Sequence, residues 1–204
     1  MLSSIIAPLK DLKHGFKPVV DAGNKILAND ALMPLNIAIS LMSSGAYQER
    51  SLAVFLFGEI APQEPVALDY LTTKVVDDPS WQVQEMLAKA LDSYSAAIGY
   101  EAALPQIREW IKAKHPALNR AVIEGLRIWT SRSYFKENPE VAVGLISSLA
   151  PKLSKKDNVY LTRSVGNALR DIKKKYPDLV KDAVRNWDHS EVAVQQAYKL
   201  LQKK

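Results

Sequence analysis

The sequence predicts an all-α protein assembled from repeated pairs of helices. Strand signals are almost absent, because no Asn-Gly or Asp-Gly turn joins two alternating β-branched runs. Windows with apolar residues at positions i, i+3, i+4 and i+7 instead follow one another from end to end. Similar helical segments also recur at intervals of 35, 43 and 31 residues. Together these observations predict a single helical repeat domain over residues 1–204.

Turn residues divide the chain into helices of roughly 10 to 18 residues joined by short polar connections. The turns are expected at 61–65, 77–80, 114–116, 137–139, 176–178 and 188–190. Two of them carry a residue typical of helix starts, Ser80 before Trp81 and Ser190 before Glu191. Each serine hydroxyl is expected to accept a hydrogen bond from a free backbone N–H of the helix that follows.

The repeat emerges when the second helix of each pair is compared with the next. Four segments share an apolar first residue, an apolar or small residue at the fifth or sixth position, and leucine at the ninth. They are VQEMLAKAL from Val83, LNRAVIEGL from Leu118, LTRSVGNAL from Leu161 and VAVQQAYKL from Val192, and the helix containing residues 51–57 lies about one further period upstream. This period is typical of a HEAT-like helical solenoid, in which antiparallel pairs stack and curve around a concave groove. An irregular all-α domain with accidental spacing is the alternative.

Two polar columns line up in this register, beside the buried seam. The third column holds Glu85, Arg120, Arg163 and Val194, and the seventh holds Lys89, Glu124, Asn167 and Tyr198. Four residues separate the columns, so both lie on one face of successive inner helices. We expect this polar band on the concave side, which suits a long partner. The alternative is a ladder of salt bridges in which Glu85 faces Arg120 and Arg120 faces Glu124.

The charge composition favours a polyanionic partner. Lysine and arginine number 27 against 22 acidic residues, which gives a net charge of +5 and a pI near 9.2. The basic residues gather toward the C-terminal half: Lys152, Lys155, Lys156, Arg163, Arg170, Lys173, Lys174, Lys175, Lys181, Arg185, Lys199, Lys203 and Lys204. Most charge runs are solvated faces, but on a concave surface these residues would follow a phosphate backbone. Nucleic acid is therefore the favoured partner.

Several classes of chemistry lack support in the sequence. The chain has no cysteine, and its three histidines are scattered singly, so we expect no disulfide, no thiol chemistry and no metal site. Phosphate-binding, dinucleotide-binding and serine-hydrolase motifs do not occur, which leaves carboxylate chemistry. The N-terminus lacks the pattern of a signal peptide and no apolar run has the length of a membrane span, so we expect a cytoplasmic protein.

The stretch WQVQEMLAKALD at 81–92 places an indole and a carboxylate on one face of a helix. Trp81 precedes Glu85 by four residues, so their side chains lie one above the other. The apolar stripe expected beside them consists of Val83, Met86, Leu87, Ala90 and Leu91. Taken alone, this helix needs only a core stripe, with Trp81 as an edge hydrophobe and Glu85 in water.

Three strings in order carry a family resemblance over roughly residues 45–190. They are WQVQEMLAKALD at 81–92, HPALNRAVIEGLR at 115–127 and SVGNALRDIKKKYPD at 164–178. Together they resemble the bacterial DNA alkylation repair glycosylases built from HEAT-like repeats, the AlkC/AlkD superfamily. The resemblance implies binding of double-stranded DNA in the concave groove. It also implies hydrolysis of the N-glycosidic bond of cationic N3- or N7-alkylated purines, without a metal or an organic cofactor.

The resemblance also assigns roles to residues. Trp81 and Glu85 match the family's Trp-x-x-x-acid pattern, Arg120 and Glu124 match its Arg-x-x-x-Glu pattern, and Asp171 falls on an acidic position. An alkylated purine is a cationic leaving group, so an indole attracts it by a cation–π interaction while a carboxylate supports the positive sugar or aligns water. The implied catalytic residues are Trp81, Glu85, Glu124 and Asp171, and the implied DNA-binding residues are Arg120, Arg163, Asn167, Arg170 and Lys173.

Three features depart from the AlkD type. Asn167 stands where that type has a further aromatic residue, the acid after Trp81 is Glu85 rather than aspartate, and the first 45 residues lack the aromatic segment that approaches the minor groove. Two interpretations therefore stay open: a glycosylase, and a non-catalytic HEAT-repeat protein that binds DNA weakly or binds another protein. We expect a monomer, and excision that is weak or undetectable on ordinary duplex DNA.

Overall fold

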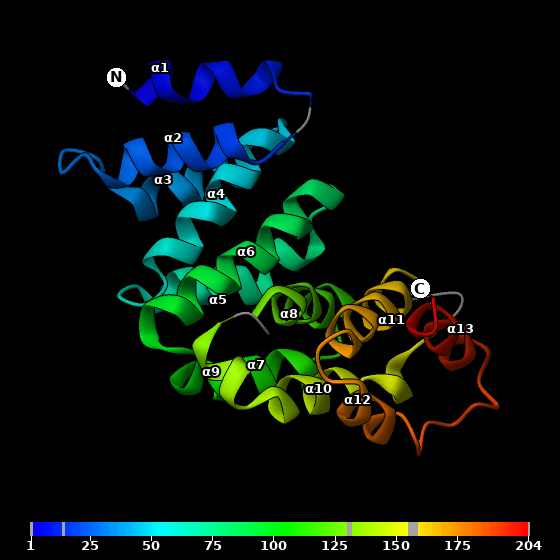
Figure 1. Ribbon diagram of the computed structural model, residues 1–204. Helices are drawn as coiled ribbons and strands as arrows, with labels where there is room; N and C mark the ends of the chain where they lie inside the picture. Colours follow the sequence, from blue (N-terminus) through cyan, green and yellow to red (C-terminus); the bar gives the residue numbers. More distant parts are fainter. Residues whose placement is uncertain (1, 14, 130–131, 155–158, 204) are drawn as a thin grey trace. The chain divides into compact units, whose positions relative to one another are not determined.

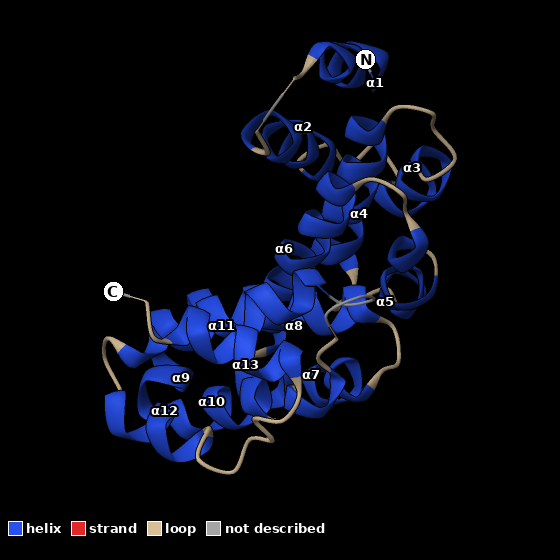
Figure 2. Ribbon diagram, turned by 90° about the vertical axis from the view of Figure 1, so that its right-hand side faces the viewer, coloured by secondary structure: helices blue, strands red, loops and turns tan. Residues whose placement is uncertain are grey.

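The computed structural model describes residues 2–13, 15–129, 132–154 and 159–203, and every structural statement below concerns these residues. The basic residues Lys155, Lys156 and Lys204 lie outside them. Throughout the described ranges the regular structure is helical and no strand occurs, which confirms the predicted all-α class (Figure 2). None of the described helices has the length and apolar character needed to cross a membrane.

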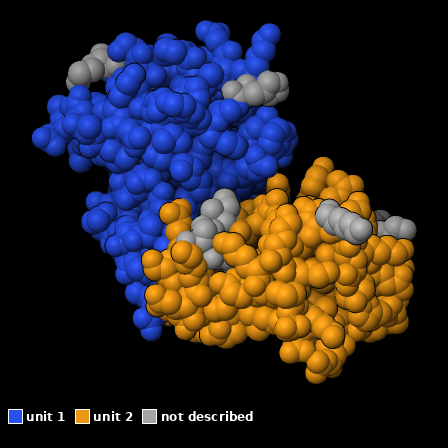
Figure 3. All heavy atoms as spheres, viewed as in Figure 1, with its two compact units in different colours: residues 1–103 blue, residues 104–204 orange. Residues whose placement is uncertain are grey.

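The chain forms two compact units, coloured separately in Figure 3. Unit 1 comprises residues 1–103 and unit 2 comprises residues 104–204. The helices up to α6 belong to unit 1, those from α8 onward belong to unit 2, and α7 (Tyr100–Lys112) begins shortly before the boundary.

Unit 1 is organised around one enclosed helix, α4. Its elements are α1 (Leu2–Ile6), the 3₁₀ helix η1 (Ala7–Asp11), α2 (Lys17–Leu27), α3 (Pro34–Leu41), α4 (Tyr47–Ile60), α5 (Pro65–Thr73), the 3₁₀ helix η2 (Val75–Asp77) and α6 (Trp81–Ile98). Helix α4 packs against α2, α3, α5 and α6 (Figure 1). It is therefore apolar almost all round, and Leu52 through Phe57 are all buried.

Unit 2 has α11 in the corresponding central place. Its elements are the rest of α7, α8 (Pro116–Trp129), α9 (Ser133–Glu137), α10 (Pro139–Ser147), the 3₁₀ helix η3 (Ala150–Lys152), α11 (Val159–Lys173), α12 (Pro177–Ala183) and α13 (Val192–Leu201). Helix α11 packs against α8, α10, α12 and α13 (Figure 1). Helix α11 thus contacts both α8 and α13, as the repeat predicted for successive inner helices.

Proline marks the start of many helices. It is the first residue of α3, α5, α8, α10 and α12. Proline suits this position because its missing N–H would have no helical partner there and its fixed φ matches the helix. Each of the turns expected at 61–65, 114–116 and 137–139 ends at the proline that begins the next helix.

Two glycines allow inner helices to approach closely. A Cβ on Gly58 of α4 would lie 2.4 Å from the Cα of Ala90 in α6. A Cβ on Gly166 of α11 would lie 2.6 Å from the carbonyl oxygen of Ala197 and 2.7 Å from the Cβ of Leu200, both in α13. Since backbone atoms stand in the way, α11 and α13 would have to move apart to accept a larger residue.

We expect Gly166→Ala to lower the free energy of unfolding by about 1–3 kcal/mol through overpacking. The control is Gly144→Ala, because Gly144 is exposed within α10 and a Cβ there would meet nothing within 4 Å. That control is expected to gain about 0.4–1 kcal/mol from reduced freedom of the unfolded chain. Urea denaturation of both variants gives the comparison, and stabilisation by both would refute the close contact of α11 with α13.

The repeat register was wrong by one residue in α13. The buried seam follows the first, fifth and ninth positions of each segment: Val83, Leu87, Leu91; Leu118, Val122, Leu126; Leu161, Val165, Leu169; and then Ala193, Ala197, Leu201. Val192 is 52% exposed and Val194 only 3% exposed, so Val194 does not belong to a polar column. The reason is steric, since the small Ala197 must face Gly166 of α11. In the corrected register, the columns continue with Gln195 and Lys199, which are both exposed.

The predicted serine caps were also wrong. Ser80 is the N-cap of α6, but its hydroxyl donates to Oε1 of Gln82 at 2.7 Å. The N-cap of α13 is Glu191, and the hydroxyl of Ser190 donates to Oδ1 of Asp188 at 2.6 Å. In both turns an aspartate two residues earlier accepts the serine N–H, and this local turn redirects the serine.

Candidate functional site

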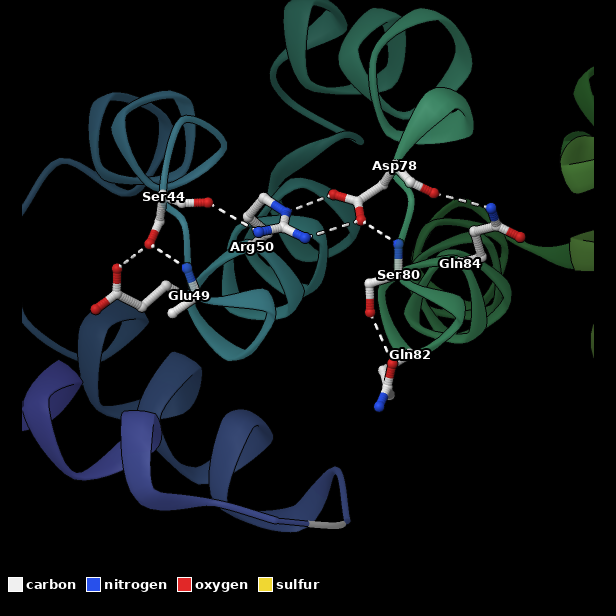
Figure 4. Close-up of polar contacts among 8 residues, drawn as sticks. Ser44, Glu49, Arg50, Asp78, Ser80, Gln82 and Gln84 are labelled. Carbon is white, nitrogen blue, oxygen red and sulfur yellow. Dashed lines mark hydrogen bonds and ion pairs between the residues drawn. The ribbon is translucent and has the colours of Figure 1, made fainter.

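The turn before α6 is held by a buried ion pair between Arg50 and Asp78 (Figure 4). Arg50 Nε donates to Asp78 Oδ2 at 2.6 Å, and Nη2 donates to Oδ1 at 3.1 Å. The Arg50 side chain is 13% exposed and that of Asp78 is 3% exposed. Arg50 Nη1 also donates to the carbonyl oxygen of Ser44 at 2.8 Å, and Gln84 Nε2 donates to the carbonyl oxygen of Asp78 at 2.9 Å. These bonds join α4 to the first turn of α6 and fix where Trp81 begins that helix.

Trp81 presents its indole at the surface of unit 1. It is 56% exposed, whereas the predicted stripe beside it is buried as expected. Glu85 lies one helical turn later and is half-buried. Trp81 and Glu85 thus stand one turn apart on α6, the first with an exposed indole and the second with a partly desolvated carboxylate.

Trp81 also borders a small hollow of about 70 Å³, in which the N-terminal segment meets α4. Phe16 and Tyr47 line the same hollow. The segment is anchored because Gln48 Nε2 donates to the carbonyl oxygen of Leu12 at 2.9 Å and Lys10 forms an ion pair with Glu49 at 3.4 Å. Two further aromatic side chains therefore share this hollow with Trp81.

In unit 2 the carboxylates of Glu124 and Asp171 meet through one arginine. Arg127 Nε donates to Asp171 Oδ2 at 2.7 Å, and Arg127 Nη1 lies 3.5 Å from Glu124 Oε2. The other carboxylate oxygen of Glu124 accepts the hydroxyl of Ser164 at 2.6 Å. Glu124 thus has partners on its own helix, Arg127, and on α11, Ser164.

Asp171 is surrounded by cations. Arg170 Nε and Lys174 Nζ lie 3.5 Å and 3.4 Å from its Oδ1, in addition to Arg127 on Oδ2. Partial burial raises the pKa of Asp171, but the hydrogen bond and charge of Arg127, then Arg170 and Lys174, outweigh burial and hold the pKa below its usual value. The carboxylate is therefore ionised and close to neutralised by its neighbours.

This lowered pKa predicts how acid affects stability. A carboxyl group with a lower pKa in the folded state stabilises the protein above its unfolded pKa of about 3.9, and the contribution is lost as the pH falls through the folded pKa. We expect the melting temperature of wild type to exceed that of Asp171→Asn at pH 6 and the gap to narrow below about pH 4. Thermal melts from pH 6 to pH 2 test this. A gap that does not depend on pH would show that the ion pairs of Asp171 contribute nothing.

Three of the DNA-binding candidates, Arg163, Asn167 and Arg170, lie along one stripe of α11. Tyr160, Arg163, Asn167 and Arg170 follow one another at helical spacing, so their side chains share a face. Tyr160 is 66% exposed, Arg163 is exposed, and the other two are half-buried. The guanidinium carbon of Arg120 on α8 lies 5.7 Å from the centroid of the Tyr160 ring, which is a cation–π distance.

The structure groups the candidates only in part. Trp81 and Glu85 belong to unit 1, and the remaining candidates belong to unit 2. Lys173 stands apart at the end of α11, where its Nζ lies 2.9 Å from Oε1 of Gln202. Within the ranges described, no group of three or more His, Cys, Asp or Glu side chains is placed to hold a metal ion.

Sequence reasoning missed the two residues that join the unit 2 candidates. Arg127 lies three residues after Glu124 and Tyr160 three residues before Arg163, so the helical spacing that placed the candidates also puts these side chains on the same faces. The partner of Arg127 gave no such signal, because Asp171 lies 44 residues away on another helix.

Two solved structures closely resemble this chain. The X-ray crystal structure of AlkD2 from Streptococcus mutans is 41% identical, with a TM-score of 0.90, over 99% of this chain and 96% of that one. The crystal structure of smu.31 from Streptococcus mutans UA159 is 40% identical, with a TM-score of 0.87, over 99% and 98% of the two chains. None of the curated proteins gives a match. The likeness confirms the helical repeat fold.

A family model gives the assignment. The model described as DNA alkylation repair enzyme matches residues 24–201, which is most of the chain. The resemblance drawn from the strings at 81–92, 115–127 and 164–178 is therefore confirmed. On this match and the crystal structures above, the chain belongs to the DNA alkylation repair enzyme family.

Proposed function

We propose that this repair protein binds double-stranded DNA through the stripe on α11 together with Arg120 of α8. The observation that carries the proposal is the arrangement at Tyr160, Arg163 and Arg170, which combines an exposed ring with cations along one helix face. Guanidinium groups suit phosphate because they donate paired hydrogen bonds, and most contacts to a duplex go to its backbone. Asn167 supplies an amide to the same face, and Lys173 extends the basic surface.

We further propose that Trp81 and Glu85 recognise the lesion. The exposed indole is suited to attract a cationic alkylated purine, and the half-buried carboxylate is suited to stabilise the positive sugar formed as the glycosidic bond breaks. The chemistry needs only these side chains and water, so the proposal includes no metal or organic cofactor. Glu124 and Asp171 belong to the same proposal, with Arg127 orienting both carboxylates.

That engagement favours the second interpretation, a non-catalytic member of the family. A carboxylate neutralised by a guanidinium gives less support to a developing sugar cation than one facing the sugar alone. In this view Glu124 and Asp171 order α8 against α11 and present Arg120 and Arg163 to the phosphates. Excision separates the two interpretations, and tight binding to duplex DNA would argue against the form of the second in which the partner is another protein.

Three further assignments complete the proposal. Residues 1–204 act as one HEAT-like repeat domain, which the continuous register from Val83 to Leu201 supports. The protein works as a monomer in the cytoplasm, a reducing compartment that suits a chain without cysteine. Analytical ultracentrifugation checks the oligomeric state.

We expect Arg163→Glu to weaken binding to duplex DNA and to lower the slope of log Kd against log salt by about one, as loss of a phosphate contact does. The matched control is Lys203→Glu, which has the same charge change at an exposed residue just after α13. Fluorescence anisotropy at several salt concentrations measures both. Equal losses in the two variants would show nonspecific attraction, and binding insensitive to salt would argue against phosphate contacts altogether.

A further inference from the structure

A ligand-sized hollow lies at the C-terminal end of unit 2, formed by α12, α13, the connection between them and the end of α11. Its volume is about 430 Å³, which falls within the range of small-molecule sites. The buried side chains of Val180, Val184 and Leu201 provide an apolar lining. The hollow is distinct from the proposed DNA-binding stripe except for Lys173, which borders it.

Cations dominate the polar part of this hollow. Lys173, Lys181 and Arg185 line it, against a single carboxylate from Asp178. Asp182 forms an ion pair with Arg185 from outside the lining, which orients the guanidinium but does not remove its remaining donors. An anion is therefore the ligand that the charge favours.

Two aromatic rings stand at the same hollow. His189 and Tyr198 meet edge to face, with ring centroids 4.8 Å apart and an interplanar angle of 82°. The loop that carries His189 is fixed, because Gln195 Nε2 donates to the His189 carbonyl oxygen at 2.8 Å and Asp188 accepts the N–H of Ser190 at 2.9 Å. The Tyr198 ring is thus held in place beside the cations before any ligand arrives.

We propose that this hollow binds a nucleoside monophosphate group. The combination of an apolar lining, a fixed aromatic pair and clustered cations matches a ligand with a flat base at one end and a phosphate at the other. Aromatic stacking accepts any base, so the site recognises the class of ligand and not one sequence. The group has two possible sources, a free nucleotide and the 5′-phosphorylated end of a DNA strand.

The test measures binding of dAMP by isothermal titration calorimetry to wild type and to the double variant Lys181→Glu/Arg185→Glu. We expect the double variant to raise Kd by about tenfold or more, because two charge-assisted contacts become repulsive. The control is Lys199→Glu/Lys203→Glu, which makes the same change of net charge at exposed residues outside the lining. Lys173 is left unchanged because it also belongs to the proposed DNA-binding residues.

Deoxyadenosine and inorganic phosphate complete the experiment. Each is expected to bind about tenfold more weakly than dAMP, since each fills half of the site. Equal affinity of phosphate and dAMP would overturn the proposal, as would equal losses in the two double variants. Tyr198→Leu, which keeps the apolar bulk, is expected to weaken the binding of dAMP and to leave the binding of phosphate unchanged.

The same variants identify the source of the ligand. A short single strand with a 5′-phosphate is compared with the same strand ending in a 5′-hydroxyl. A strand end is the ligand if the phosphorylated strand binds more tightly than dAMP and loses this advantage in Lys181→Glu/Arg185→Glu. A free nucleotide is the ligand if dAMP binds more tightly than either strand. If the affinity for duplex DNA is unchanged in Lys181→Glu/Arg185→Glu, this site is separate from the proposed DNA-binding stripe.

Discussion

Asp78→Asn is expected to cost about 3–5 kcal/mol of unfolding free energy, because it leaves the charge of Arg50 buried without its partner. Arg50 has few alternatives, since its side chain is only 13% exposed and its other recorded bond is to the carbonyl oxygen of Ser44. The same change weakens the acceptor that Asp78 offers to the N–H of Ser80. Urea denaturation measures the loss, and a variant still folded in the absence of urea is required for the value to be meaningful.

The chain provides a matched control for this pair. Lys17 and Asp21 also lie 2.6 Å apart, but their side chains are 83% and 48% exposed. Asp21→Asn is therefore expected to change stability by less than about 1 kcal/mol. Arg50→Met combined with Asp78→Asn removes the stranded charge and should recover part of the loss. If Asp78→Asn and Asp21→Asn cost the same, burial of the Arg50–Asp78 pair has no energetic weight.

The largest functional effect concerns excision. We expect the wild-type protein, even in large excess, to release little or no free 7-methylguanine or 3-methyladenine from ordinary duplex DNA. The N-terminal segment of unit 1 is held against α4 by Gln48 and Lys10. Phe16 is the one Phe, Trp or Tyr among the first 45 residues, where the resemblance implies an aromatic segment in AlkD-type enzymes. Chromatography of the released bases measures the result directly.

Any release that does occur should depend on Glu85. Glu85→Gln keeps the size and the hydrogen-bonding capacity of the side chain but removes its charge, so excision should fall by about 10²–10³, as when one transition-state stabilising group is lost. Trp81→Ala is expected to weaken recognition of the lesion and to reduce stability only slightly, because the indole is already 56% exposed. Robust turnover in wild type, abolished by Glu85→Gln, would show that the missing N-terminal element is not needed.

The helices were predictable because their signals are local. The apolar stripe of α6 and the prolines that begin α5, α8 and α10 lie within a few residues of the structure they determine. The register of α13 failed because Val192 and Ala193 are both apolar, and the choice between them depends on how closely Gly166 lets two helices approach. That distance is a property of the packed pair and not of either sequence segment.

In the candidate site, too, only the features set by local sequence spacing were predictable. Trp81 and Glu85 share a face by spacing alone, and the exposure of the indole agrees with that prediction. The partners that hold the surrounding structure come from distant helices, with Arg50 and Asp78 separated by 28 residues and Arg127 and Asp171 by 44. A single sequence contains no periodic signal for such pairs.

The central positions of α4 and α11 make their buried backbone amides the last to be exposed to water when each unit unfolds. Neighbouring helices cover the buried faces of α4 within unit 1 and of α11 within unit 2, so the amide hydrogens on those faces reach water only when the surrounding helices separate. Hydrogen–deuterium exchange in these two helices therefore reports opening of the whole unit, whereas short helices such as α1 report local fraying. The exchange rate of the slowest amides in α4 thus measures the opening of unit 1, and that of the slowest amides in α11 measures the opening of unit 2. Equal rates would mean that the two halves of the chain unfold in one cooperative event, and unequal rates would identify the half that opens first.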